Sequence, residues 1–266
     1  MARKRWITWL VHGCGLYDVI DRMSWPNRRI EITRHVVAAP VARRVTLALV
    51  ADLHFVRVGE RERRLIELLE RERPDAIALN GDFGEIGGEP DACGPVLERL
   101  RAPLGVWATL GNWDYAHPVA DWNAFLDARG VRLLRNAATR LVEGLWLAGL
   151  DSALLGWPDL EAALVGVPGE ALVATLIHCP VLFDDVAGRV PLVLAGHAHG
   201  GQLRLPPLPP LYMPSGCGPF VSGWYERRGS RMYVSRGIGC SSLPVRIGSR
   251  PEIALFEFVP AGDSGR

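Results

Sequence analysis

One pattern recurs along this sequence: an apolar segment rich in aliphatic residues stops just before an aspartate, asparagine or histidine. Such apolar runs are typical of buried β-strands. The carboxyl ends of neighbouring strands in an α/β sheet open onto one crevice. The polar residues that follow these segments are Asp52, His54, Asp82, Asn112, His178, His197 and His199. The pattern therefore predicts that seven side chains able to bind metal converge on a single site.

The two last residues of that set belong to the segment Gly196-His197-Ala198-His199-Gly200-Gly201-Gln202. In an extended backbone, residues two apart leave the chain on the same side, so both imidazoles would face one way. The glycines and the alanine around them leave room for cations beside the main chain. On this motif alone a second interpretation stays open, in which one histidine is on the surface and the other is a hydrogen-bonded core residue.

Apolar and amphipathic segments alternate in the order expected of an α/β fold. The expected strands are residues 45–51, 75–79, 103–110, 131–134, 138–142, 145–150, 172–177, 190–195, 232–235 and 252–258, with 28–33 and 202–205 as further candidates. The expected helices are residues 59–73, 91–100, 119–129 and 160–164. We expect one main domain over residues 41–260, an N-terminal helical segment and lead-in strand over residues 1–40, and a frayed tail over residues 261–266.

The ligand types restrict the metal. Carboxylate and amide oxygens combined with imidazoles, without a thiolate, suit Mn²⁺, Fe or Zn²⁺ rather than a structural zinc site built from cysteines. Seven ligands exceed the needs of one tetrahedral ion. They match two ions that lie about 3.5–4 Å apart and share one carboxylate ligand.

The order of these motifs, DxH, GD, GN, H and GHxH, resembles that of the calcineurin-like metallophosphoesterases. The resemblance is strongest to their small bacterial phosphodiesterase-type branch, and it covers about residues 45–258. It is carried by the GHAHGGQ segment at residues 196–202 and by the ending SRGIG at residues 235–239, PVR at residues 244–246 and RPE at residues 250–252. It implies two packed β-sheets with helices outside, an αββα sandwich.

The resemblance also implies roles for individual residues. Asp52, His54, Asp82 and His199 would hold one metal ion. Asp82 would bridge to a second ion held by Asn112, His178 and His197. A hydroxide between the ions would then attack phosphorus in line.

One position departs from the family pattern, which usually reads GNHD. That histidine is thought to assist the transition state or to protonate the leaving group, and here the residue is Trp113. An indole cannot transfer protons at neutral pH. His117 is the candidate substitute, with a plain loop histidine as the alternative. Asp151, which follows the expected strand 145–150, is a candidate to orient a histidine ligand.

Composition excludes some classes of protein and leaves others open. A formal net charge of +1 over 266 residues gives no reason to expect a nucleic-acid partner. Five scattered cysteines without CxxC spacing indicate reduced thiols and a cytoplasmic protein. Basic residues beside two tryptophans in residues 3–11 allow weak contact with the inner face of a membrane; an amphipathic helix packed on its own domain is the alternative. The proline-rich residues 208–212, within an irregular loop expected over residues 206–219, form either a wall of the substrate site or a polyproline ligand for a partner.

These observations predict a dinuclear metal-dependent phosphoesterase that hydrolyses phosphodiesters or monoesters. Two alternatives remain at this point. Trp113 motivates a metal-binding but catalytically weak regulatory or scaffold protein. The basic and aromatic residues 3–11 motivate a peripheral membrane phosphohydrolase acting on a lipid-linked phosphate.

Overall fold

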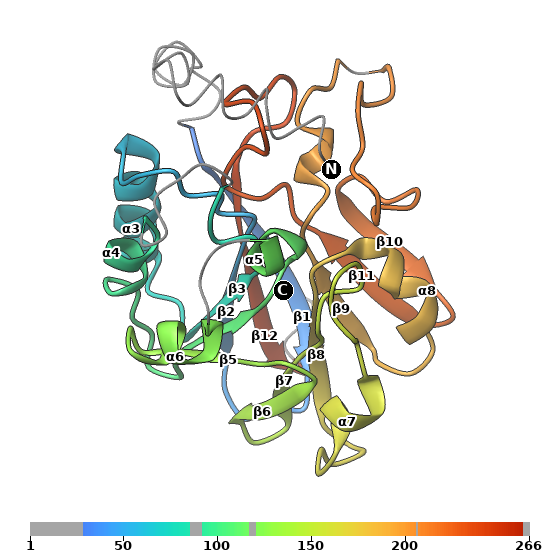
Figure 1. Ribbon diagram of the computed structural model, residues 1–266. Coiled ribbons are helices and arrows are strands. Elements are labelled where there is room, and N and C mark those ends of the chain that lie inside the picture. The colour runs from blue at the N-terminus through green and yellow to red at the C-terminus, as the bar shows by residue number, and fades with distance from the viewer. Residues whose placement is uncertain (1–28, 86–91, 117–120, 206, 263–266) are drawn as a thin grey trace.

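The computed structural model describes residues 29–85, 92–116, 121–205 and 207–262. Two six-stranded sheets pack face to face, and short helices cover their outer faces (Figure 1). The αββα sandwich implied by the resemblance is therefore confirmed. His117 and residues 3–11 lie outside the described residues, so the predictions made for them stay predictions.

The first sheet has the strand order β1-β12-β2-β3-β4-β5. Its strands are β1 (Glu31–Ala39), β12 (Glu252–Pro260), β2 (Val45–Ala51), β3 (Ala76–Asn80), β4 (Val106–Thr109) and β5 (Val131–Leu133). β2 to β5 run parallel, and β12 pairs antiparallel to β2 and parallel to β1. The lead-in strand is thus an edge strand of this sheet, and it is longer than the sequence indicated.

The second sheet has the order β10-β11-β9-β8-β7-β6. Its strands are β10 (Gly223–Arg227), β11 (Ser230–Val234), β9 (Leu192–Ala195), β8 (Leu172–Ile177), β7 (Leu145–Gly149) and β6 (Ala137–Val142). β7, β8, β9 and β11 are parallel, while β6 and β10 pair antiparallel at the two edges. In each sheet the parallel strands end on the same side, and this places the loops after β2, β3, β4, β8 and β9 together.

Alternation along each strand separates the core into layers. In β2, Leu47 and Leu49 lie in the cluster between the two sheets, whereas Ala48 and Val50 face the helices outside. This is the two-residue period of a strand buried on both faces. All four side chains are fully buried, so β2 is held rigidly from both sides.

Among the described residues, the helices are short apart from α3 (Glu60–Glu72). α3, α4 (Gly94–Leu97) and α6 (Trp122–Asp127) cover the first sheet, and α7 (Leu160–Leu164) and α8 (Phe183–Val186) cover the second (Figure 1). The remaining helical turns are α5 (Asn112–Ala116), η2 (Pro180–Leu182) and η3 (His199–Gly201). Within the described part of the chain, no helix is both long and apolar enough to cross a membrane.

The sequence prediction of a strand at residues 202–205 is wrong. Only one isolated bridge, between Leu203 and Ile247, forms there. The prolines that follow in the sequence have no amide hydrogen to continue a ladder, so the segment becomes an ordered loop. The expected helices 91–100 and 119–129 are also shorter than predicted, since only α4 and α6 form within those segments.

Candidate metal centre

Loops from both sheets bring the candidate ligands together. Among the described residues there are three clusters of potential metal ligands, and within each cluster the ligand atoms lie within 4.8 Å of one another. We call Asp52, His54 and His199 the His54 group, and His178, Cys179 and His197 the His178 group. Asp82 lies between the two groups, because its Oδ2 is 3.5 Å from His54 Nε2 and 3.2 Å from His178 Nε2.

In the His54 group, the two imidazoles face each other. His54 Nε2 and His199 Nε2 are 3.1 Å apart, and both rings are buried. The Asp52 carboxylate accepts the backbone N–H of His197 at 2.8 and 3.0 Å from its two oxygens. Asp52 therefore joins the loop after β2 to the loop after β9, across the two sheets.

Buried charged side chains lie next to the Nδ1 atoms of both histidines in the His54 group. Glu85 Oε2 lies 2.9 Å from His54 Nδ1, and the carboxylate is almost fully buried. On the other side, Arg246 Nη2 lies 3.2 Å from His199 Nδ1, and Arg246 is completely buried. Arg246 also donates to the carbonyls of Arg236, Gly239 and His199. The sequence analysis did not single out Glu85, and it used Arg246 only as part of the family resemblance.

Backbone carbonyls support the His178 group. His178 Nδ1 donates to Asn80 O at 3.0 Å, which leaves Nε2 directed at Asp82. His197 Nε2 lies 2.7 Å from Ser215 O, which leaves Nδ1 as the atom available for a ligand. A hydrogen bond to one imidazole nitrogen determines which nitrogen can bind metal.

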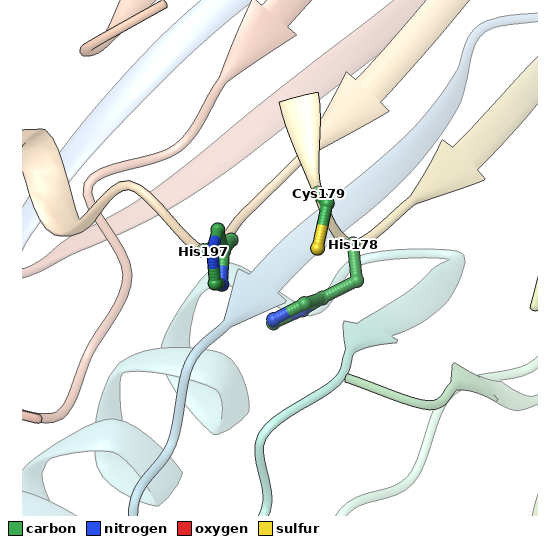
Figure 2. Close-up of side chains that lie close together, drawn as sticks. All are labelled: His178, Cys179 and His197. Carbon is green, nitrogen blue, oxygen red and sulfur yellow. The ribbon is translucent and has the colours of Figure 1, made fainter. Parts of the chain in front are cut away.

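Cys179 is a further side chain that the sequence analysis missed at this place. Figure 2 shows its sulfur beside the rings of His178 and His197, at the ends of β8 and β9. Burial raises the pKa of the Cys179 thiol well above its ordinary value, so the thiolate is disfavoured. Its position directly after His178 is the only feature of the sequence that could have indicated it.

Asn112 completes the predicted set at the start of α5. Its Oδ1 is buried and has no hydrogen-bond partner within the described structure, and the same holds for Asp82 Oδ2 and His178 Nε2. The next residue, Trp113, donates its backbone N–H to Asp82 Oδ1 at 2.8 Å. Buried polar atoms without partners are costly, and a bound cation would satisfy all three. The donor set thus fits a metal site.

Close packing of the loops depends on two glycines. A Cβ at Gly81 would lie 2.4 Å from Gly111 N, and one at Gly111 would lie 2.1 Å from Asp82 Oδ1. Gly81 also has φ +70°, which L-residues with side chains rarely adopt. The glycine before Asp82 and the glycine before Asn112 therefore let the loops after β3 and β4 approach each other and His178.

Backbone strain is concentrated on the ligands. Asp52, His54, Asp82, His197 and His199 all have positive φ, between 43° and 67°. Such conformations cost about 1 kcal/mol or more for a residue with a side chain and cluster at functional sites. The fold therefore holds these five residues in place at the expense of stability.

Two more buried residues bind the loops to one another. Asp114 accepts the backbone N–H groups of Asp82, Phe83 and Gly111 at 2.7–2.8 Å. Asn80 Nδ2 donates across the sandwich to the carbonyls of Ile177 and Leu194. In the sequence, each was marked only by its position two residues from a predicted ligand, Asp82 or Asn112.

The carboxylates and imidazoles shift one another's pKa values. Burial by itself would lower the pKa of His178, but Asp82 and Asp52 outweigh it and raise that pKa to about 9. Burial and the charge of His178 lower the pKa of His197 to about 4. The metal-free site therefore holds a proton on His178, and a cation would replace it, because ligation requires a neutral imidazole.

Asp151 lies apart from the ligand histidines. Among the described residues, its hydrogen bonds come from Tyr115, from Arg135 Nε at 2.9 Å, and from the backbone amides of Ser152 and Trp157. These contacts join α5 to the loop after β7. The predicted role of Asp151 in orienting a histidine ligand stays a prediction, and its contacts here do not include such a histidine.

The comparisons with known proteins agree with this site. No protein-family model matches the sequence. A curated relative named "Uncharacterized metallophosphoesterase YkuE", from Bacillus subtilis (strain 168), is 32% identical over 204 residues, which cover 72% of this chain and 70% of that protein. The chain therefore belongs to the metallophosphoesterases and is a metal-dependent phosphoric ester hydrolase.

Other relatives point the same way. "Phosphodiesterase YaeI" of Escherichia coli (strain K12) is 29% identical, with 80% of this chain and 82% of that protein covered. "Transmembrane protein with metallophosphoesterase domain" of Danio rerio is 29% identical over 78% of this chain, and the chain spans about half of that protein's length, 51%. Among solved structures, calcineurin-like phosphoesterase YfkN from Bacillus subtilis has a TM-score of 0.43 at 15% identity, covering 74% of this chain and 82% of that chain.

Proposed function

We propose that the chain is a dinuclear phosphoesterase that prefers phosphodiesters. One observation carries the proposal: Asp82 lies within 3.5 Å of imidazoles from both groups, while its Oδ2 and His178 Nε2 have no hydrogen-bond partner within the described structure. A carboxylate placed between two sets of imidazoles is the arrangement that two ions sharing one ligand require. The preference for diesters is supported by the name of the relative YaeI alone.

In this proposal, Asp52, His54, Asp82 and His199 hold one ion, and Asp82, Asn112, His178 and His197 hold the other. Two divalent cations, Mn²⁺, Fe or Zn²⁺, supply Lewis acidity, which lowers the pKa of water and neutralises charge on the phosphoryl oxygens. The chain's own residues do the positioning. Glu85 and Arg246 orient His54 and His199, and the carbonyls of Asn80 and Ser215 orient His178 and His197.

The proposal places the protein in the cytoplasm, because its cysteines are odd in number and scattered along the sequence. The substrate in this proposal is a phosphate ester. At the position where the family usually has an acid histidine, this chain has the indole of Trp113. Trp113 packs edge-on against His54, with ring centroids 5.6 Å apart. An indole gives the leaving group no proton, so substrates with good leaving groups should react best.

The test is hydrolysis of bis-p-nitrophenyl phosphate and p-nitrophenyl phosphate by metal-stripped protein titrated with Mn²⁺. Asp82→Ala should abolish turnover, and Asp159→Ala serves as the matched control because Asp159 caps α7 away from the site. Faster hydrolysis of the diester supports the stated preference. Metal-loaded protein that turns over neither ester would overturn the enzymatic proposal and favour a metal-binding regulatory or scaffold protein.

A further inference from the structure

Exposed apolar side chains gather on two loops beside the candidate metal centre. We define the apolar loop face by its six members, with their exposed fractions: Leu205 56%, Leu208 60%, Leu211 73%, Tyr212 54%, Leu243 39% and Ile247 44%. Scattered apolar residues on a surface are ordinary, whereas a contiguous group marks an interaction site. Other exposed apolar residues, such as Val36 and Val165, lie on β1 and just after α7.

Hydrogen bonds join the two loops into a single surface. Arg204 N donates to Ile247 O at 2.8 Å, and Leu211 N donates to Leu203 O at 3.0 Å. The Gln202 side chain donates to Leu243 O at 3.0 Å. These hydrogen bonds therefore join the described residues of the two loops into one surface.

The same loop is attached to the metal ligands at both ends. It begins directly after His199, where a Cβ at Gly201 would lie 2.5 Å from Pro210 Cβ. It returns at Ser215, whose carbonyl oxygen lies 2.7 Å from His197 Nε2. The loop that carries most of the apolar loop face is thus anchored beside the candidate metal centre at both ends.

The two loops that carry this face have arginines but no acidic residues. Residues 198–225 and 237–251 contain no aspartate or glutamate. Their arginines are Arg204, Arg246 and Arg250, of which Arg246 is buried while the other two reach the surface. Leucine and tyrosine on loops that carry arginine and no acidic residue complement an anionic lipid surface, where apolar side chains insert and cations meet the headgroups.

We propose that the apolar loop face docks on an anionic lipid surface and that the phosphate ester reaching the metals belongs to a lipid headgroup. This inference rests on the proposed phosphoesterase function for its substrate, while the docking itself does not. Leu208 and Leu211 insert, because they are the two most exposed leucines of the face. Arg204 provides the preference for anionic headgroups.

The experiment is sedimentation of the full metal-loaded chain with vesicles of phosphatidylglycerol and phosphatidylcholine, or of phosphatidylcholine alone. The double variant Leu208→Gln/Leu211→Gln should bind the anionic vesicles at least about tenfold more weakly than the wild type. Val36→Gln/Val165→Gln removes two equally exposed apolar side chains elsewhere and should bind as the wild type does. Arg204→Gln should reduce the difference between the two kinds of vesicle.

Hydrolysis of bis-p-nitrophenyl phosphate, measured on the same samples, separates the two proposals. Vesicle binding without hydrolysis would contradict the proposed function and still support the docking surface. Equal vesicle binding by the wild type and the leucine variant would overturn the docking surface and leave residues 3–11 or another part as the contact. A wild-type dimer that becomes monomeric in the leucine variant, without vesicle binding, would overturn it in favour of a second copy of the chain.

Discussion

The two groups of the candidate metal centre are built differently. In the His54 group, the buried side chains of Glu85 and Arg246 lie against the ligand imidazoles. In the His178 group, the backbone carbonyls of Asn80 and Ser215 take that place. Carbonyls move only with the fold, whereas charged side chains can be changed one at a time. Single substitutions should therefore damage the His54 group far more readily than the His178 group.

Arg246→Met should have the largest effect. It removes the donor to the carbonyls of Arg236, Gly239 and His199 in a fully buried place, and unsatisfied buried groups cost about 1–3 kcal/mol each. We expect the free energy of unfolding, measured in urea, to fall by about 2–5 kcal/mol. Arg140→Met, at an exposed arginine of β6, is the control and should change it by less than about 0.5 kcal/mol. Equal losses of unfolding free energy in the two variants would show that Arg246 does not stabilise the His54 group.

Trp113→His should raise the rate on phosphodiesters with poor leaving groups by about 10²-fold, because an imidazole can donate the proton that an indole cannot. p-Nitrophenyl esters, whose leaving group is good, should gain much less. The control is Trp113→Phe, which keeps an aromatic ring against His54 without a proton to transfer. A similar gain for both variants in steady-state kinetics would assign the effect to packing.

Glu85→Gln should weaken the binding of one metal ion by about tenfold, because the charge beside His54 Nδ1 makes that ligand more basic. Ser215→Ala is the matched change in the other group, and it leaves in place the carbonyl that holds His197. Titration calorimetry with Mn²⁺ should therefore find one weakened step for Glu85→Gln and none for Ser215→Ala. Equally weakened Mn²⁺ binding in the two variants would contradict the difference proposed between the two groups.

The pH dependence of stability should differ between metal-free and metal-loaded protein. His178 has its pKa raised from 6.5 to about 9 without metal, so its stabilising effect is fully present below pH about 6.5 and is lost as pH rises through about 9. The loss proceeds at up to about 1.4 kcal/mol per pH unit. Urea unfolding of wild type and His178→Gln, both metal-free, should show the difference shrinking over this range. In metal-loaded protein His178 is neutral, so a difference that shrinks equally there would contradict the assignment.

Much of the centre could be predicted from sequence for a physical reason. Hydrophobic runs indicate strands, and parallel strands bring the residues after them to one edge of a sheet, which places Asp52 beside Asp82. His178 follows a strand of the second sheet, and the packing of the two sheets brings it to the same site. Glu85, Ser215 and Arg246 reach the site through loops, and loop conformation leaves no periodic signal in a sequence. Their roles therefore became visible only in three dimensions.

The same reason explains the errors in the fold. Residues 202–205 look like a strand by composition, yet they form one bridge with Ile247 and then turn into the apolar loop. β10 was missed because Gly223–Arg227 mixes a glycine, two aromatic and two charged residues without alternation. Its place in the sheet comes from pairing with β11, which is a tertiary contact.

The most direct test counts the metal ions. Metal-stripped wild-type protein is loaded with Mn²⁺, separated from free metal by gel filtration and analysed by mass spectrometry of the elements. The account predicts about two ions per chain in the wild type, about one each in His199→Ala and His197→Ala, and no stable occupancy in Asp82→Ala. One ion in the wild type, or two retained without Asp82, would contradict a centre in which that carboxylate joins both groups.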